Sequence, residues 1–151
     1  MIFSIEKGRH RSSFLPSFTF KNIISGQFSL LEISEINSED TNKIIGLSDN
    51  WHHHKDSIRI GWRYYKNKVE LMAYLYVDDK RIVEHLCYID KKENIDFLLE
   101  IRSDEYVIWI NEYTKKYKRE SRWNFLRVIL KPYFGGKDKA PKNIKLNLKW
   151  S

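Results

Sequence analysis

The sequence predicts one all-β domain. Aromatic residues make up 15% of the chain, and flat side chains of this kind pack well on a pleated sheet. Apolar and polar residues alternate with period two along most of the chain, and no long apolar stripe has the helical period. Nine short strands with this spacing are typical of a sandwich or a barrel, and we expect them at 17–24, 27–33, 57–65, 68–77, 81–89, 95–102, 106–111, 125–131 and 143–150.

Turn-forming residues separate most of these runs. Glycine, asparagine, aspartate and serine allow the backbone to reverse within two residues. The expected turns are Ser25-Gly26, Lys66-Asn67, Asp78-Asp79, Ser103-Asp104 and Gly135-Gly136.

Length and charge limit the classes of protein. A chain of 151 residues is the size of one domain, so we assign residues 1–151 to a single β-sandwich. The net charge of +7 has two explanations, which are solubility and an acidic partner such as an anionic polysaccharide, a nucleic acid or a membrane surface. Basic residues are spread along the chain, and the one dense cluster, 115–119, is typical of a solvated loop or an edge strand.

The single cysteine, Cys87, excludes an intramolecular disulfide, and its apolar neighbours predict a buried core residue. No stretch is apolar for long enough to form a membrane helix, so we expect no membrane association. No secretory signal is visible at the start, which favours the cytoplasm, although a signal removed from the chain would leave the same sequence. The sequence does not indicate an oligomeric state.

The central hairpin has a register that can be tested for consistency. With Lys66-Asn67 as a two-residue turn, Arg59 lies opposite Tyr74 and Arg63 opposite Glu70. One face of the hairpin is then wholly apolar, and a slip of one residue would mix the faces. Across the Asp78-Asp79 turn, Glu84 would point toward the core, so we expect a bulge or an edge position near it.

The polar face of this hairpin is the first candidate binding surface. Arginine forks match carboxylates and sulfates, and tyrosine rings can stack on sugars while offering a hydroxyl. Its candidate residues are Arg59, Arg63, Glu70, Tyr74, Tyr76, Arg81 and His85. The alternative is an ordinary solvated sheet, held by an Arg63–Glu70 pair and an Arg59–Tyr74 stack.

Three adjacent histidines form the second candidate. Neighbouring residues of a strand point in opposite directions, so at most His52 and His54 share a face, and we predict no metal site even with Asp49 or Asp56 nearby. We expect a loop that brings His53 or His54 to the polar face, where an adjacent arginine would lower the pKa of the imidazole. A third segment, 7–13, surrounds His10 with cations and fits an anion-contacting loop or a solvated turn.

Catalytic signatures are absent from the sequence. We find no G-x-S-x-G, H-E-x-x-H, phosphate loop, dinucleotide fingerprint or C-x-x-C, and we predict no cofactor. The E-x-D-x-x-E strand pattern of many sandwich glucanases is also missing, so the catalytic residues stay unknown.

Two parts of the chain resemble known proteins. Residues 42–49, 52–54 and 57–63 are similar to a group of small bacterial proteins, and 131–136 with Ala140-Pro141 resembles the last turns of polysaccharide-lyase-like sandwiches. Both resemblances imply the concanavalin A-like superfamily, and therefore a two-sheet antiparallel jelly-roll sandwich. Lectins, glycan-binding modules, hydrolases and lyases share this architecture.

Three functions follow as hypotheses. The first is a non-catalytic domain that binds an acidic glycan on the Arg/Tyr face. The second is a polysaccharide lyase, in which Arg59 or Arg63 neutralises a uronic acid, His53, His54 or His85 is the base and Tyr74 is the acid. Single-stranded nucleic-acid binding ranks third, because the aromatics largely alternate inward.

Overall fold

Two six-stranded antiparallel sheets face each other in the computed structural model, which describes residues 1–12, 15–36 and 38–151. The described residues contain no helix. The back sheet has the order β1 (Ile2–Ile5), β12 (Ile144–Trp150), β3 (Ile23–Glu32), β8 (Ile95–Ile101), β9 (Glu105–Ile110) and β10 (Tyr113–Lys118). The front sheet has the order β2 (Ser17–Thr19), β11 (Arg127–Leu130), β4 (Asn42–Ser48), β5 (Ser57–Tyr65), β6 (Lys68–Val77) and β7 (Lys80–Ile89).

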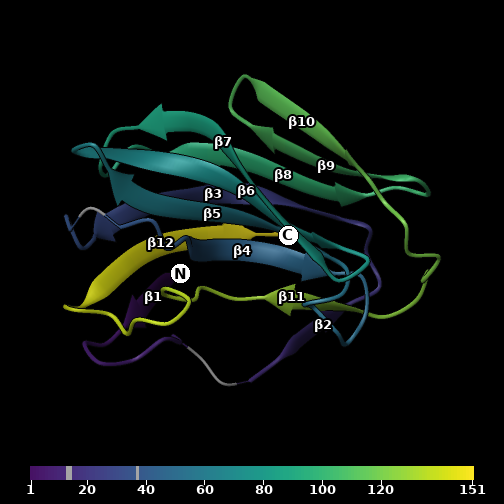
Figure 1. Cartoon of the computed structure of the whole chain (residues 1–151), viewed down its shortest axis with the longest axis horizontal. Coiled ribbons are helices and arrows are strands. Elements are labelled where there is room, and N and C mark those ends of the chain that lie inside the picture. The colour runs from purple at the N-terminus through teal and green to yellow at the C-terminus, as the bar shows by residue number, and fades with distance from the viewer. Residues whose placement is uncertain (13–14, 37) are drawn as a thin grey trace.

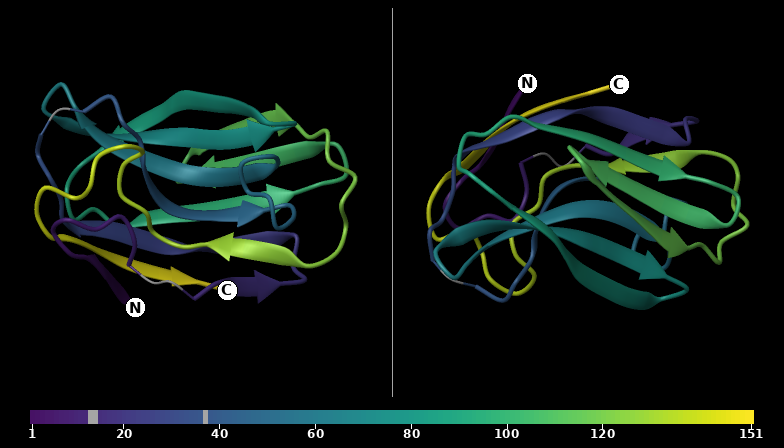
Figure 2. Two further views of the ribbon diagram at one scale, coloured as in Figure 1. Left: turned by 60° about the horizontal axis from the view of Figure 1, so that its bottom comes forward. Right: turned by 90° about the horizontal axis from the view of Figure 1, so that it is seen from above.

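The two layers are visible in Figure 1, and Figure 2 shows them stacked with both termini on the back-sheet side. Alternate residues of most strands turn inward and form one core between the sheets, in which Phe28, Trp62, Phe97 and Tyr106 are among the largest side chains. The predicted all-β, two-sheet antiparallel sandwich is therefore confirmed. The described residues also contain no helix of the length and apolarity that crossing a bilayer requires.

The predicted hairpin register is confirmed along the full length of β5 and β6. Arg59 pairs with Tyr74 and Arg63 with Glu70, while Trp62 pairs with Leu71 on the buried face. Both two-residue turns have positive φ at each position, which the two-residue hairpins of twisted sheets require. The turn residues are Lys66, Asn67, Asp78 and Asp79.

The expected irregularity near Glu84 is also present. Strand β7 is the edge of the front sheet, and its register with β6 shifts between Leu71 and Met72. The carboxylate of Glu84 accepts a hydrogen bond from the Tyr117 hydroxyl at 2.8 Å. Glu84 is thus satisfied at the open side of the sandwich, where β7 of one sheet approaches β10 of the other.

The prediction of a turn at Ser25-Gly26 is wrong, because both residues lie inside β3. Gly26 pairs with Phe97 on one side and with Trp150 on the other. A Cβ at Gly26 would lie 1.9 Å from the carbonyl oxygen of Lys149. Glycine is therefore needed here for the close approach of β12, not for a change of direction.

Strands β1, β4 and β10 were not among the expected strands. The alternation of β4 is interrupted by a register shift between Lys43 and Ile45. Strand β10 is an exposed polar edge, which confirms the edge-strand alternative for the 115–119 cluster. Its last member, Arg119, differs from the rest of the cluster because it is buried.

Arg119 belongs to a buried ionic cluster that joins the two sheets. The carboxylate of Asp49, at the end of β4, accepts hydrogen bonds from Arg119 Nε at 2.6 Å and Nη2 at 2.7 Å. It accepts another from the Tyr106 hydroxyl of the back sheet at 2.8 Å, and Arg127 Nη2 lies 3.7 Å away. Arg119 also donates to the carbonyl oxygens of Arg102 and Ser103. Asp49 is therefore a structural anion.

We expect Asp49→Asn to lower the free energy of unfolding by about 3–5 kcal/mol, because it leaves the charges of Arg119 and Arg127 buried without their counter-ion. Urea unfolding followed by tryptophan fluorescence measures this change. The matched control Asp96→Asn alters an exposed carboxylate and should leave the midpoint unchanged. Equal midpoints for the two variants would contradict the structural role of Asp49.

Candidate functional site

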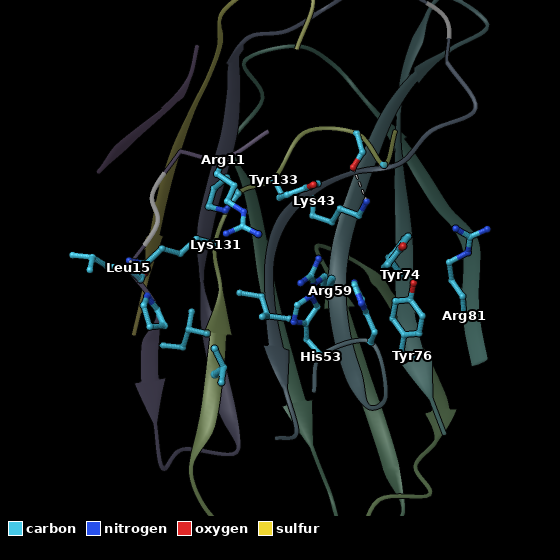
Figure 3. A pocket seen from close by; sticks show the side chains of 18 residues that line it. Arg11, Leu15, Lys43, His53, Arg59, Tyr74, Tyr76, Arg81, Lys131 and Tyr133 are labelled. Carbon is cyan, nitrogen blue, oxygen red and sulfur yellow. Dashed lines mark hydrogen bonds between the residues drawn. The ribbon is translucent and has the colours of Figure 1, made fainter. Parts of the chain in front are cut away.

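A groove of about 530 Å³ lies on the outer face of the front sheet. It is of the size that ligand sites usually have. Figure 3 shows its side chains spread across the strands, from Leu15 on one side to Arg81 on the other. The lining residues are Arg11, Leu15, Pro16, Lys43, His53, His54, Arg59, Tyr74, Tyr76, Arg81, Val128, Ile129, Leu130, Lys131, Pro132, Tyr133, Gly135 and Gly136.

Arg59 of β5 lies near the centre of the groove, beside Tyr74 of β6. Its neighbour on β4 is Gly46, where a Cβ would be 2.4 Å from Arg59 Cγ, so the glycine makes room for the arginine. Arg59 Nε is buried and has no hydrogen-bond partner among the described residues. Burial lowers the pKa of Arg59 to about 10, so the group is still charged at neutral pH.

Lys43 of β4 provides a second buried cation. Its Nζ donates to the carbonyl oxygen of Gly135 at 3.0 Å and lies 4.6 Å from the centre of the Tyr74 ring. Burial and repulsion from Arg59 lower the pKa of Lys43 to about 8, and attraction from the Asp40 carboxylate opposes part of this shift. Lys43 was not predicted as a site residue, because β4 was not recognised as a strand of this sheet.

Tyr133 was also not predicted as a site residue. It follows β11 and forms isolated bridges to Lys43 on one side and Arg11 on the other, so it extends the sheet beneath the groove. The His10 ring stacks on it at 5.3 Å, and His10 Nδ1 is 2.9 Å from the carbonyl oxygen of Phe134. This stacking holds the N-terminal segment beside the groove. The Lys131–Gly136 resemblance was the one sequence signal at this position.

Two of the three adjacent histidines, His53 and His54, line the groove, where the loop interpretation expected one. The His54 ring lies 5.2 Å from the Tyr76 ring and 4.2 Å from that of His53. Burial and repulsion from Arg59 lower the pKa of His53 to about 4 and also lower that of His54. His53 is therefore neutral at physiological pH. The pKa is lowered, as the sequence predicted for an imidazole beside an arginine.

Tyr74 and Tyr76 form the floor of the groove near β7. Burial and a hydrogen bond with Tyr76 raise the pKa of Tyr74, and Arg81 opposes the increase. The Tyr74 hydroxyl is therefore protonated at neutral pH.

Three predicted residues on the same hairpin face do not line the groove. Arg63 Nε donates to Glu70 Oε2 at 2.6 Å, and His85 Nδ1 lies 2.8 Å from Glu70 Oε1. Burial acts to raise the pKa of Glu70, but hydrogen bonds from Arg63 and His85 outweigh it, so the pKa is lowered. The Arg63 guanidinium also covers the Tyr65 ring at 4.3 Å. This half of the polar face is satisfied within the protein.

Metal ligation by the histidine region finds no support in the contacts of the nearby carboxylates. Asp49 is engaged by Arg119 and Tyr106, and the Asp56 carboxylate accepts the backbone N–H of Asp78 at 3.0 Å. In the part of the chain that the structure describes, no group of three or more His, Cys, Asp or Glu side chains is arranged to hold a metal ion.

The charged side chains that line the groove are all positive. It includes five basic side chains and no aspartate or glutamate, the five being Arg11, Lys43, Arg59, Arg81 and Lys131. Among the described residues, none of these five has a carboxylate within ion-pair distance. An anion is the ligand that complements this field.

Comparison with known proteins supports the fold. No protein-family model matches the chain, and no curated protein matches it. Among solved structures, an alginate lyase from Pseudomonas aeruginosa is similar, with a TM-score of 0.63 and 10% identity, over 85% of this chain and 63% of that enzyme. Alginate lyase AlyC3 gives a TM-score of 0.69 and 9% identity, covering 99% of this chain and 74% of the enzyme.

A Bacteroides ovatus family 16 glycoside hydrolase from a mixed-linkage glucan locus, solved with an oligosaccharide product, is also similar. Its TM-score is 0.57 at 13% identity, over 99% of this chain and 78% of the enzyme. The chain thus spans less than two thirds of the Pseudomonas enzyme, and identities near 10% establish the fold alone. That fold is the concanavalin A-like jelly-roll sandwich.

We expect NMR titration of the Lys43 side chain to give a pKa near 8, and Arg59→Gln to raise it, because the substitution removes a neighbouring positive charge. The control Arg63→Gln changes an arginine that lies outside the groove and should leave the Lys43 pKa where it is. A Lys43 pKa near 10.5 in the wild-type protein would contradict the buried, repulsive environment described above.

Proposed function

We propose that this protein binds an acidic polysaccharide in the groove of the front sheet. One observation carries the proposal, namely that five basic side chains and no carboxylate line the groove. Cations without counter-ions on one concave surface raise the local concentration of anions and favour their binding. The class of ligand is therefore a polyanion that can lie across the strands.

Arg59 is the residue on which binding should depend most. Its charged group has already been removed from much of the surrounding water, and no protein carboxylate compensates for that loss. A uronate carboxylate or a sulfate would supply two oxygens for the guanidinium fork. Because the free protein already carries the desolvation cost, most of the energy of this contact would appear as affinity.

The tyrosines favour a sugar over a small inorganic anion. Tyr74, Tyr76 and Tyr133 offer ring faces and hydroxyls beside the cations, a combination that suits the apolar face and the hydroxyl groups of a pyranose. The similarity to two alginate lyases and to a glucan hydrolase supports a polysaccharide as the ligand.

We expect Arg59→Ala to weaken binding of acidic oligosaccharides by at least tenfold, because a hydrogen bond to a charged group contributes about 1.5–3 kcal/mol. Calorimetric titration with alginate, pectate, heparin and hyaluronate fragments measures the change, and binding should weaken as salt increases.

The matched control is Arg63→Ala. Arg63 lies on the same strand and the same face as Arg59. It is paired with Glu70, however, and does not line the groove. It should retain wild-type affinity. Equal losses in the two variants, or affinity that Arg59→Ala leaves unchanged, would refute the proposed groove.

A polysaccharide lyase is the second candidate, favoured by the neutral His53 and the protonated Tyr74 beside Arg59. In β-elimination, Arg59 would neutralise the uronate carboxylate, His53 or His54 would take the C5 proton and the Tyr74 hydroxyl would protonate the leaving oxygen. Arg63 and His85 no longer enter this scheme, because both are bound to Glu70 outside the groove.

Cleavage by this route would produce an unsaturated sugar that absorbs ultraviolet light. If the protein is a lyase, absorbance should increase on one of the four acidic polysaccharides, and one of the two variants His53→Gln and His54→Gln should abolish the increase without abolishing binding. If absorbance does not change on a polysaccharide that calorimetry shows to bind, the lyase hypothesis is rejected and polysaccharide binding without catalysis is retained.

A further inference from the structure

Five exposed aromatic side chains lie beside the groove, at the β2 edge of the front sheet. They are between 39% and 70% exposed, which is unusual for large apolar groups. We call this group the aromatic platform, and it consists of Phe18, Phe20, Trp51, Trp123 and Phe125.

The rings of the aromatic platform form two contacting groups, Phe18 with Trp51, and Phe125 with Phe20 and Trp123. Phe18 and Trp51 are 5.0 Å apart between ring centres, Phe20 and Phe125 are 5.5 Å apart, and Trp123 and Phe125 are 6.3 Å apart. Grouped apolar side chains of this kind on a protein surface mark binding sites more often than single exposed residues do.

The aromatic platform is continuous with the groove. Phe18 pairs with Val128 of β11, and paired residues of neighbouring strands point to the same side of a sheet. Val128 lines the groove. Across the strands, Val128 pairs with Ser48, Ser48 with Ser57 and Ser57 with Tyr76, so one row of paired residues runs from Phe18 to Tyr76. Trp51 precedes His53, a groove residue, by two positions. A chain lying in the groove would therefore reach Phe18 and Trp51.

The loops that carry the platform tryptophans are held by hydrogen bonds. The backbone N–H of His52 donates to Asn50 Oδ1 at 2.7 Å, and the Ser48 hydroxyl donates to the Asn50 carbonyl oxygen, which fixes the loop at Trp51. Trp123 Nε1 donates to the Leu126 carbonyl oxygen at 3.0 Å, and Arg119 donates to the Trp123 carbonyl oxygen. Loops fixed in this way lose little freedom when a ligand binds.

We propose that the aromatic platform, chiefly Trp51 and Phe18, stacks further sugar rings of the polysaccharide whose charged groups occupy the groove. The ligand is then an extended acidic polymer that crosses the strands from Arg81 past Arg59 to Trp51. Six strands at a spacing of about 4.8 Å give a path of about 24 Å, which accommodates several sugar units. This inference rests on the proposed function for the identity of the polymer.

The two adjoining surfaces require two kinds of group from one ligand. The groove requires anions, and the platform requires flat apolar faces without charge. An acidic polysaccharide repeats a carboxylate or sulfate and an apolar C–H face at every sugar unit, so one chain satisfies both. Single-stranded nucleic acid also combines anions with flat rings, and it is the competing ligand.

A length series of the acidic oligosaccharide found to bind in the Arg59 experiment tests the proposal. In the wild-type protein, affinity measured by calorimetry should increase from the disaccharide to the octasaccharide. In Trp51→Ala, the long members should bind about five- to tenfold more weakly, while the shortest members bind as they do to the wild type. Phe18→Ala should show the same pattern, which makes the result independent of one variant.

The matched control is Trp109→Ala. Trp109 is 38% exposed, but it lies on β9 in the back sheet, so its loss should leave the whole length series unchanged. Circular dichroism and thermal unfolding of each variant will show that it is folded, as expected for exposed positions.

The outcomes separate the two proposals. If short oligosaccharides bind but affinity does not grow with length, or if Trp51→Ala and Phe18→Ala retain the full length effect, the platform proposal is overturned and the groove proposal stands. If no acidic oligosaccharide binds at any length, the proposed function itself fails. Tighter binding of oligothymidylate than of any acidic oligosaccharide would overturn both in favour of nucleic acid.

Discussion

The register of the β5–β6 hairpin determines which side chains the protein offers to a ligand. Trp62 and Leu71 pair on one face and are almost completely buried, so the core fixes the register. Arg59 and Tyr74 must then face outward on the same ladder. A slip of one residue would bury Arg59 and expose Trp62, so packing that never touches a ligand positions the groove.

Local patterns were sufficient to predict this hairpin, because both faces alternate without interruption and the turns are two residues long. They failed where tertiary contacts override local preference. Gly26 resembles a turn residue, yet it serves the close approach of β12, which lies more than a hundred positions away. Strand β4 escaped prediction because its register shift interrupts the alternation.

The candidate site was half predictable for the same reason. Arg59, Tyr74, Tyr76 and Arg81 follow from the hairpin, whereas Lys43 and Tyr133 meet through a bridge between segments about ninety residues apart. Local sequence patterns do not show that Lys43 and Tyr133 come together in the groove. Nor do they show that Glu70 binds both Arg63 and His85 and keeps them out of the groove. Similar side chains on one face thus differ in role because their neighbours differ.

The two halves of that face also explain why an anion is the expected ligand. Glu70 neutralises the charge of Arg63 in one half; in the other half no carboxylate lines the groove, and repulsion from Arg59 adds to burial in lowering the pKa of Lys43 and His53. By linkage, any ligand that restores the pKa of Lys43 must bind its protonated form more tightly. An anionic sugar does so, whereas a neutral glucan leaves the repulsion in place. Under the proposed function, the charge of the groove would therefore discriminate between polysaccharides that the fold alone would accept equally, and the aromatic platform would add affinity only to a chain that the groove has already selected.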